Sequence, residues 1–328
     1  MTPLAESLRA EIARNGPIPF HRFMRAALYD PEHGYYRRPR DPFGKHGDFF
    51  TAEQLQPVFG LLMAARIRMM YQEMGAPADF TVVELGAGRR EMAEAFAEWR
   101  HVSVDLDGGE LPEHFSGVVF SNEFFDALPV EAAVYHDGAW RERLVGWDER
   151  FIWLTGAPVR AEIADYLSRN GPPAEEGALG EVNLEALRWL DRIARALDAG
   201  FVCAVDYGYT RAEAARFPHG SLMSYRRHQA DEDVLEDPGA RDITTHVAFT
   251  ALQEHGARLG FETTRFETLA QTLLSAGEAD QFAAALAAST PEEQSRRRLQ
   301  LKTLLFGMGE TFRTLILRAG GALAKGAK

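Results

Sequence analysis

A short apolar segment followed by a glycine turn constrains the fold of this chain more than any other feature. Residues 80–85, Phe-Thr-Val-Val-Glu-Leu, are mostly apolar and β-branched, which is typical of a parallel strand buried on both faces. Gly86-Ala87-Gly88 follows directly. Glycines let the backbone approach a ligand closely, and a helix N-terminus offers N–H groups to it. The segment therefore predicts a strand, a tight turn and a helical stretch to about Trp99.

Further strands are expected downstream, and they indicate the fold class. Val102–Asp105, Gly117–Glu123 and Phe201–Asp206 are short apolar runs that end in acids. Strands that alternate with helices predict an α/β fold with a doubly wound, mostly parallel sheet. The stretch between the last two differs, because Asp137-Gly138 and Asp148-Glu149 are typical of β-hairpin turns.

The composition excludes several classes of protein. The 328 residues carry a net charge of −12, which argues against a broad nucleic-acid surface. The single cysteine, Cys203, excludes an intrachain disulfide and is expected in the core. The N-terminus resembles no secretory signal, and no run of 18 apolar residues is present, so we expect a cytoplasmic protein without a membrane span. The ten histidines show no metal-ligand spacing, so no metal is expected.

Polar residues at the first two strand ends are candidate ligand-binding residues. The turn that contains Gly86 and Gly88 is not specific by itself, because similar turns bind NAD or FAD, or bind nothing. Asp105 stands 17 positions after Gly88. An acid about 20 residues beyond such a loop commonly binds ribose hydroxyls. Capping of the following turn is an equally good interpretation of Asp105, and Asp107 is a competing candidate.

A third group of polar residues, Asn122, Glu123 and Asp126, follows the strand Gly117–Glu123. Ligands of open α/β sheets bind at the carboxyl ends of the strands. Two carboxylates can hold a guanidinium by bidentate hydrogen bonds or orient an amine for attack on a methyl group. The alternative is a helix N-cap with acids in the first turn.

Taken in order, several sequence blocks resemble the MidA-like methyltransferases, relatives of the arginine methyltransferase of mitochondrial complex I assembly. They include the glycine turn with Glu84, and the run from Asn122 to Val130. The remaining blocks are Gly16–Met24, Ala27–Tyr36, Gly47–Thr51, Pro57–Gly60, Asp206–Tyr209 and Asp242–Phe249.

The resemblance implies a Rossmann-like class I methyltransferase fold that binds S-adenosyl-L-methionine (SAM). It implies that Glu84, Asp48 and Thr51 lie near the cofactor, and that Asn122, Glu123 and Asp126 bind the acceptor. The acceptor would be a protein arginine or a similar nitrogen, on a protein or on a small molecule. The resemblance also leaves a homodimer open.

The sequence patterns and the resemblance together divide the chain into four segments. These are an N-terminal helical segment with a cofactor-covering loop (1–78), the first part of the SAM-binding core (79–130), an inserted lid or substrate subdomain of hairpins and helices (131–199), and the rest of the core with C-terminal helices (200–328).

The chain departs from the family pattern at several positions. Arg90 replaces the third glycine of the turn, Gln54 replaces a glutamate and Ala248 an aspartate. Only 28 positions separate Arg90 from Val118, so one strand and one helix are expected to be missing.

These departures keep a second function open, a non-catalytic assembly or scaffold protein with a degenerate SAM-binding fold. A nicotinamide oxidoreductase would need a full Gly-x-Gly-x-x-Gly motif, and position 91 is Glu91.

Overall fold

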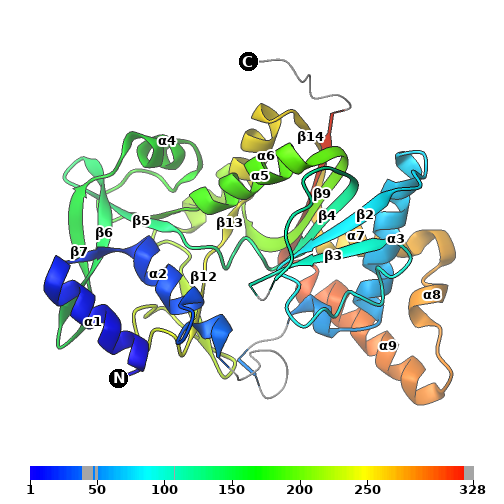
Figure 1. The fold of residues 1–328 in the computed structure, drawn as a ribbon, viewed down its shortest axis with the longest axis horizontal. Coiled ribbons are helices and arrows are strands. Elements are labelled where there is room, and N and C mark those ends of the chain that lie inside the picture. Colours follow the sequence, from blue (N-terminus) through cyan, green and yellow to red (C-terminus); the bar gives the residue numbers. More distant parts are fainter. Residues whose placement is uncertain (39–46, 49–50, 107, 321–328) are drawn as a thin grey trace. The chain divides into compact units, whose positions relative to one another are not determined.

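The computed structural model describes residues 1–38, 47–48, 51–106 and 108–320 (Figure 1). The chain forms two compact units, each built from several stretches of sequence. Unit 1 comprises Met1–Phe50, Phe125–Leu187 and Tyr209–Ala251, and unit 2 comprises Thr51–Phe124, Arg188–Gly208 and Leu252–Lys328. The four segments expected from the sequence remain a prediction. They were defined by expected function, whereas the two units are defined by contacts between residues.

Unit 2 is built on the expected α/β sheet. Its strands lie in the order β14-β15-β9-β4-β2-β3. β3, β2, β4 and β9 are parallel, while β15 and β14 run antiparallel to their neighbours. The strands span β2 Phe80–Leu85, β3 Arg100–Val104, β4 Phe115–Asn122, β9 Leu197–Tyr209, β14 Phe261–Thr268 and β15 Phe312–Ala319. The four parallel strands predicted from the sequence are therefore confirmed.

Apolar side chains on the two central strands build the core of unit 2. Val82 and Val83 of β2 pair in register with Val118 and Val119 of β4, and all four are buried. Helix α3 (Val58–Glu73) packs into one buried cluster with Val82 and Val118. The other helices are α5 Leu184–Ala196, α6 Phe249–Arg258, α7 Leu269–Gly277, α8 Ala283–Leu286 and α9 Pro291–Thr303.

The prediction of a helix between the glycine turn and Trp99 is wrong. The described residues between β2 and β3 form consecutive turns, with hydrogen bonds such as Trp99 N–H to Phe96 O at 3.1 Å. Gly88 and Arg90 have φ angles of 47° and 59°, which a right-handed helix cannot accommodate. The chain therefore returns to the sheet through turns that bury Met92 and Phe96.

The sheet of unit 2 has few strands on the β3 side, as expected from the short segment between Arg90 and Val118. Among the described residues, only β3 lies beyond β2, whereas a doubly wound sheet of the order 3-2-1-4-5-6 has two strands on that side. No helix lies between β3 and β4 among the residues that the structure describes. Asp105 therefore follows β3 directly, next to the glycine turn in the sheet.

Unit 1 combines two small sheets with helices. The first sheet has the order β1-β6-β5-β8, with β7 beside β6, and the second the order β11-β10-β12. Both expected hairpins are confirmed, since β5–β6 turn at Asp137-Gly138 and β6–β7 turn at Glu149. Bounds are α1 Pro3–Asn15, β1 Ile18–Pro19, α2 Phe20–Tyr29, β5 Glu131–His136, β6 Ala139–Asp148, β7 Arg150–Pro158, α4 Ala161–Asn170, β8 Leu179–Val182, β10 Met223–Arg226, β11 Gln229–Asp231, β12 Asp242–Thr244 and β13 Val247–Ala248.

None of the helices within the described residues combines the length and apolar character needed to cross a bilayer.

Candidate functional site

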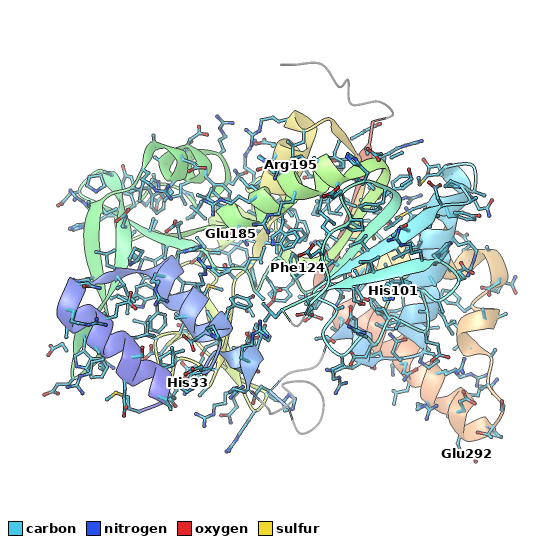
Figure 2. All side chains as sticks on the ribbon, viewed as in Figure 1. His33, His101, Phe124, Glu185, Arg195 and Glu292 are labelled. Carbon is cyan, nitrogen blue, oxygen red and sulfur yellow. The ribbon has the colours of Figure 1, made fainter. Side chains whose placement is uncertain are left out.

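The glycine turn and Asp105 lie together at the carboxyl ends of β2 and β3. The Gly86 N–H donates to Val104 O at 2.9 Å, and the Gly88 N–H donates to Asp105 Oδ2 at 2.6 Å. Gly86 has a φ of 71°, and a Cβ there would lie 2.9 Å from the ring of Phe124 (Figure 2). The turn thus needs glycine both for its backbone and for its close packing. Asp107, the competing candidate, lies outside the described residues.

Glu84 ends β2 as a buried acid. Its Oε2 lies 2.7 Å from Nε2 of His101 on β3, and its side chain is only 1% exposed. Figure 2 labels His101. Burial raises the pKa of Glu84, and the hydrogen bond from His101 opposes that rise. The second oxygen, Oε1, is buried and has no hydrogen-bond partner among the described residues. A buried acceptor without a donor is costly, so this oxygen is suited to a donor on a ligand.

The end of β4 holds Asn122 and Glu123 in a constrained arrangement. Glu123 has a left-handed φ of 52°, an uncommon conformation outside glycine that is found at functional sites. Its Oε1 accepts from the Ala52 N–H at 3.3 Å and from Asn122 Nδ2 at 3.2 Å. Asn122 Oδ1 is buried without a hydrogen-bond partner in the described structure. The alternative of a helix N-cap is wrong, because turns rather than a helix follow this strand.

Thr51 leads into a 3₁₀ turn, Ala52–Gln54, that carries an acid missed by sequence reasoning. Thr51 is buried and makes no side-chain cap hydrogen bond. Glu53 is only 6% exposed, and burial, followed by Glu84, raises its pKa well above the usual range. The sequence held one indication of an acid in this turn. The family pattern has a glutamate at the position of Gln54, directly after Glu53. The amide atoms of Gln54 are buried and have no hydrogen-bond partner among the described residues.

Asp48 belongs to unit 1, where its carboxylate binds several groups. Oδ2 accepts from Tyr35 Oη at 3.0 Å and from Arg38 Nη2 at 3.3 Å. Oδ1 accepts from the Arg227 N–H at 2.8 Å. These bonds tie the segment before Asp48 to the turn between β10 and β11. Phe49 and Phe50, which share its sequence block, lie outside the described residues.

Asp126 lies buried in unit 1 within a second group of acids. Its backbone carbonyl accepts from the Thr245 N–H at 3.0 Å, beside Asp242 of β12. Tyr36 Oη donates to Asp242 Oδ1 at 2.9 Å. Burial, followed by the charge of Asp126, raises the pKa of Asp242 to about 7. Unit 1 therefore holds a buried pair of acids, Asp126 and Asp242. The sequence analysis identified only Asp126 as a candidate site residue.

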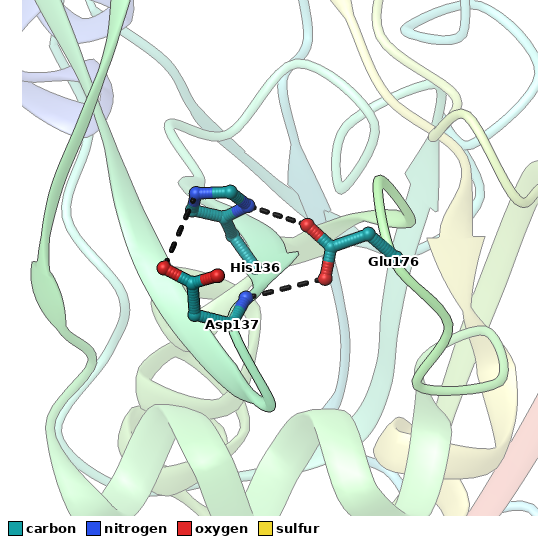
Figure 3. Close-up of side chains that lie close together, drawn as sticks. All are labelled: His136, Asp137 and Glu176. Carbon is teal, nitrogen blue, oxygen red and sulfur yellow. Dashed lines mark hydrogen bonds and ion pairs between the residues drawn. The ribbon is translucent and has the colours of Figure 1, made fainter.

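Three exposed side chains gather at the β5–β6 hairpin, as Figure 3 shows. Glu176 accepts from the Asp137 N–H and pairs with the ring of His136, while Asp137 lies 3.5 Å from the other ring nitrogen. The contacts of Glu176 satisfy the backbone of a tight turn. All three side chains are largely solvated, and the arrangement is that of surface ion pairs.

Two remaining residues singled out from the sequence have clear environments. Cys203 is fully buried, which confirms it as a core residue, and burial raises its pKa to about 12. Arg90 is exposed to solvent at the edge of the glycine turn.

Comparisons with known proteins show which family this chain matches. A family described as "Putative S-adenosyl-L-methionine-dependent methyltransferase" matches residues 91–267. The mitochondrial protein arginine methyltransferase NDUFAF7 homolog of Drosophila melanogaster is 28% identical over 309 residues, covering 75% of this chain and 68% of that protein. The human protein arginine methyltransferase NDUFAF7 is 26% identical, with 77% of this chain and 68% of that protein covered.

Two solved structures share the fold of this chain, and one of them contains a ligand. A Burkholderia thailandensis protein bound to S-adenosyl-homocysteine (SAH) has a TM-score of 0.83 and 29% identity, covering 99% of this chain and 95% of that one. A native structure from the same organism has a TM-score of 0.80 and 30% identity over the same shares.

The residues of unit 2 fit such a ligand. The glycine turn permits close approach, the Asp105 carboxylate is an acceptor of the type that ribose hydroxyls bind, and the buried Glu84 Oε1, which has no partner among the described residues, suits an ammonium N–H.

Proposed function

Because this chain belongs to the family of SAM-dependent methyltransferases that it matches, we propose that it methylates the nitrogen of a protein arginine or of a similar acceptor. The proposed nitrogen acceptor is supported by the arrangement of side chains at the end of β4. There, Asn122 offers a buried oxygen that has no donor among the described residues, and Glu123 is fixed in a left-handed conformation. A guanidinium or amine has the N–H groups that such acceptors need.

The cofactor-binding residues in this proposal are Glu84, Gly86, Gly88 and Asp105, with Asp48 and Thr51 as the contribution of the preceding loop. When bound, SAM supplies a methyl carbon already activated by a sulfonium. The protein therefore has to position the acceptor and stabilise charge rather than generate a reactive group.

The chain's own residues would act on the acceptor nitrogen. Asn122 Oδ1 accepts one N–H of the acceptor and fixes its orientation. The carboxylate of Glu123, held by the Ala52 N–H and the Asn122 amide, accepts the proton that the nitrogen loses as its bond to the methyl carbon forms and the carbon–sulfur bond breaks. Asp126 supplies a second carboxylate for a cationic acceptor.

Calorimetric titration with SAH is the first test of this proposal. Wild-type protein is expected to bind SAH in the micromolar range, and Gly86→Arg is expected to abolish binding because the side chain would meet Phe124. Absence of binding at millimolar SAH would contradict the enzyme and support the alternative, a non-catalytic scaffold protein.

Transfer of a labelled methyl group to arginine-containing peptides tests the acceptor. At saturating SAM, Glu123→Gln is expected to lower kcat by about 10²-fold, the usual contribution of a positioned proton acceptor. Glu98→Gln is the matched control, because Glu98 is an exposed acid that pairs with Arg68 at the surface. Equal turnover by the Glu123→Gln and wild-type proteins would refute this role of Glu123, and label on another nitrogen would identify a different acceptor.

A further inference from the structure

His101 of β3 contacts a candidate cofactor residue, and the proposed mechanism does not use it. Its Nε2 lies 2.7 Å from Oε2 of the buried Glu84, and the imidazole side chain is 12% exposed. An ionised carboxylate can only accept, so in this contact the imidazole donates and Nε2 carries the hydrogen. The contact therefore links the edge strand of the sheet to the acid that ends β2.

The register of the two strands brings both side chains to one face of the sheet. β2 and β3 are parallel, with Val82 opposite His101 and Glu84 opposite Ser103. Successive residues of a strand point to opposite faces, so residues two positions apart share a face. His101 and Glu84 are therefore diagonal neighbours on the same face, and the strand pairing itself brings them together.

Phe96 packs against the imidazole and restricts its position. The two rings meet edge to face, with centroids 5.5 Å apart and planes at 77°. The same phenylalanine packs against Phe120 at 5.4 Å, and Phe120 stands opposite Glu84 in β4. Both phenylalanines are fully buried. The donor to Glu84 is thus held by a packed aromatic cluster rather than by a mobile surface group.

The contact with His101 affects how the two oxygens of Glu84 can be used. Oε2 accepts from His101, whereas Oε1 is buried and has no hydrogen-bond partner among the described residues. Burial raises the pKa of Glu84, the contact with His101 lowers it, and Glu91 and Asp105 raise it further. His101 thus favours the ionised carboxylate, in which both oxygens are acceptors.

The amino-acid part of SAM or SAH carries a donor that suits the remaining oxygen. Its ammonium has a positive charge and N–H groups, and a hydrogen bond between an ammonium and a carboxylate is stronger than one between neutral groups. The bond requires an ionised carboxylate that is held in one orientation. His101 contributes to both requirements, because its N–H occupies Oε2 and leaves Oε1 as the acceptor for the ligand.

We propose that His101 is a positioning residue, which donates to Glu84 Oε2 and so orients the carboxylate for Oε1 to receive the ammonium of the cofactor. This inference rests on the role of Glu84 in the proposed function. Since His101 needs no contact with the cofactor, its loss is expected to affect only ligands that carry the ammonium. 5′-Methylthioadenosine (MTA) provides the comparison, because it keeps the adenosine and the thioether sulfur of SAH but lacks the amino-acid part.

Calorimetry on the full chain with SAH and MTA tests the inference. His101→Leu is expected to weaken SAH binding by about tenfold, the scale of one hydrogen bond to a charged group, and to leave MTA binding unchanged. His101→Gln keeps an N–H donor and is expected to bind SAH within about threefold of wild type. His114→Leu is the matched control, because His114 pairs with Asp198 at the surface.

A double-mutant cycle tests whether His101 acts through Glu84. In a Glu84→Gln background, His101→Leu is expected to change SAH affinity by less than about twofold, because the carboxylate that His101 orients is no longer present. Additive losses in the two single variants and the double variant would assign the effect of His101 to another contact and overturn the inference.

The outcomes separate the inference from the function on which it rests. Equal losses of SAH and MTA binding in His101→Leu, or no loss of either, would overturn the role of His101 while leaving the methyltransferase intact. Failure of wild-type protein to bind SAH would overturn the proposed function itself. Thermal unfolding of the ligand-free variants checks folding. If His101→Leu does not fold, His101→Asn takes its place with the same expected results, since its shorter amide does not reach Glu84.

Discussion

Arg90 occupies a backbone conformation that glycine adopts at lower cost. Its φ of 59° costs a non-glycine residue about 1 kcal/mol, part of which the greater freedom of unfolded glycine would offset. Arg90→Gly is therefore expected to raise the free energy of unfolding by roughly 0.5 kcal/mol. Because the side chain is exposed, SAH affinity should stay unchanged. Urea unfolding and calorimetry measure the two effects.

Arg89→Gly is the control for this prediction. Arg89 is also exposed but lacks a positive φ and pairs with Glu91, so glycine there should destabilise the protein by about 0.5–1 kcal/mol through both the backbone and the lost ion pair. If Arg90→Gly instead strengthened SAH binding, the arginine would be obstructing the cofactor site.

Sequence reasoning located the residues whose positions follow from strand ends. Glu84, Gly86 and Asp105 each follow or end a parallel strand, and the carboxyl ends of such strands share one edge of the sheet. Glu53 could not be found in this way. Its burial depends on how a short turn packs beside β4, and an acid in a loop is ordinarily solvated.

Within the sheet of unit 2, Gly117 of β4 permits an unusually close approach of two strands. Its φ is 152°, and a Cβ would lie 1.9 Å from Thr81 O of β2. Gly117→Ala must separate the two strands, so it is expected to lower the free energy of unfolding by about 3 kcal/mol or more. Gly108→Ala is the matched control, since Gly108 has a φ of 136° but no atom within 4 Å of its Cβ position.

Chemical denaturation followed by circular dichroism compares the two variants. A loss of similar size in both would assign the cost to backbone strain and contradict the steric account.

The strands of the sheet were easier to predict from the sequence than the segments that connect them. The valines of β2 and β4 specify buried strands, and these were found at the expected positions. The stretch after Gly88 contains good helix formers, yet it forms turns. There the left-handed Gly88 and Arg90 and the burial of Met92 and Phe96 override local helical preference.

At the scale of the whole molecule, buried acids make stability depend on pH in an unusual direction. The chain is already acidic, with a net charge of −12. Asp242 in unit 1 and Glu53 in unit 2 both have raised pKa values because of burial and neighbouring acids. Each unit is thus expected to be most stable when its buried acids are protonated, and to lose stability as the pH rises.

Asp242 allows this expectation to be tested quantitatively. Its carboxyl ionises near pH 4 in the unfolded chain but at about 7 in the fold. Between these values the folded protein binds more protons than the unfolded chain, so the free energy of unfolding falls as the pH rises. Asp242→Asn keeps an acceptor for Tyr36 but cannot ionise. It is expected to flatten this dependence and to stabilise the protein at pH 8 by up to ~4 kcal/mol.

Urea unfolding at several pH values between 5 and 8 measures the difference between wild type and Asp242→Asn. Asp165→Asn is the control, because Asp165 is an exposed acid paired with Arg169 and its removal should leave the profile of wild type. Parallel profiles for wild type and Asp242→Asn would mean that Asp242 ionises alike in both states. Profiles that approach each other at low pH, diverge up to about pH 7 and keep a constant separation above it would instead assign the pH dependence to Asp242, since only an acid whose pKa is raised in the fold produces that sign.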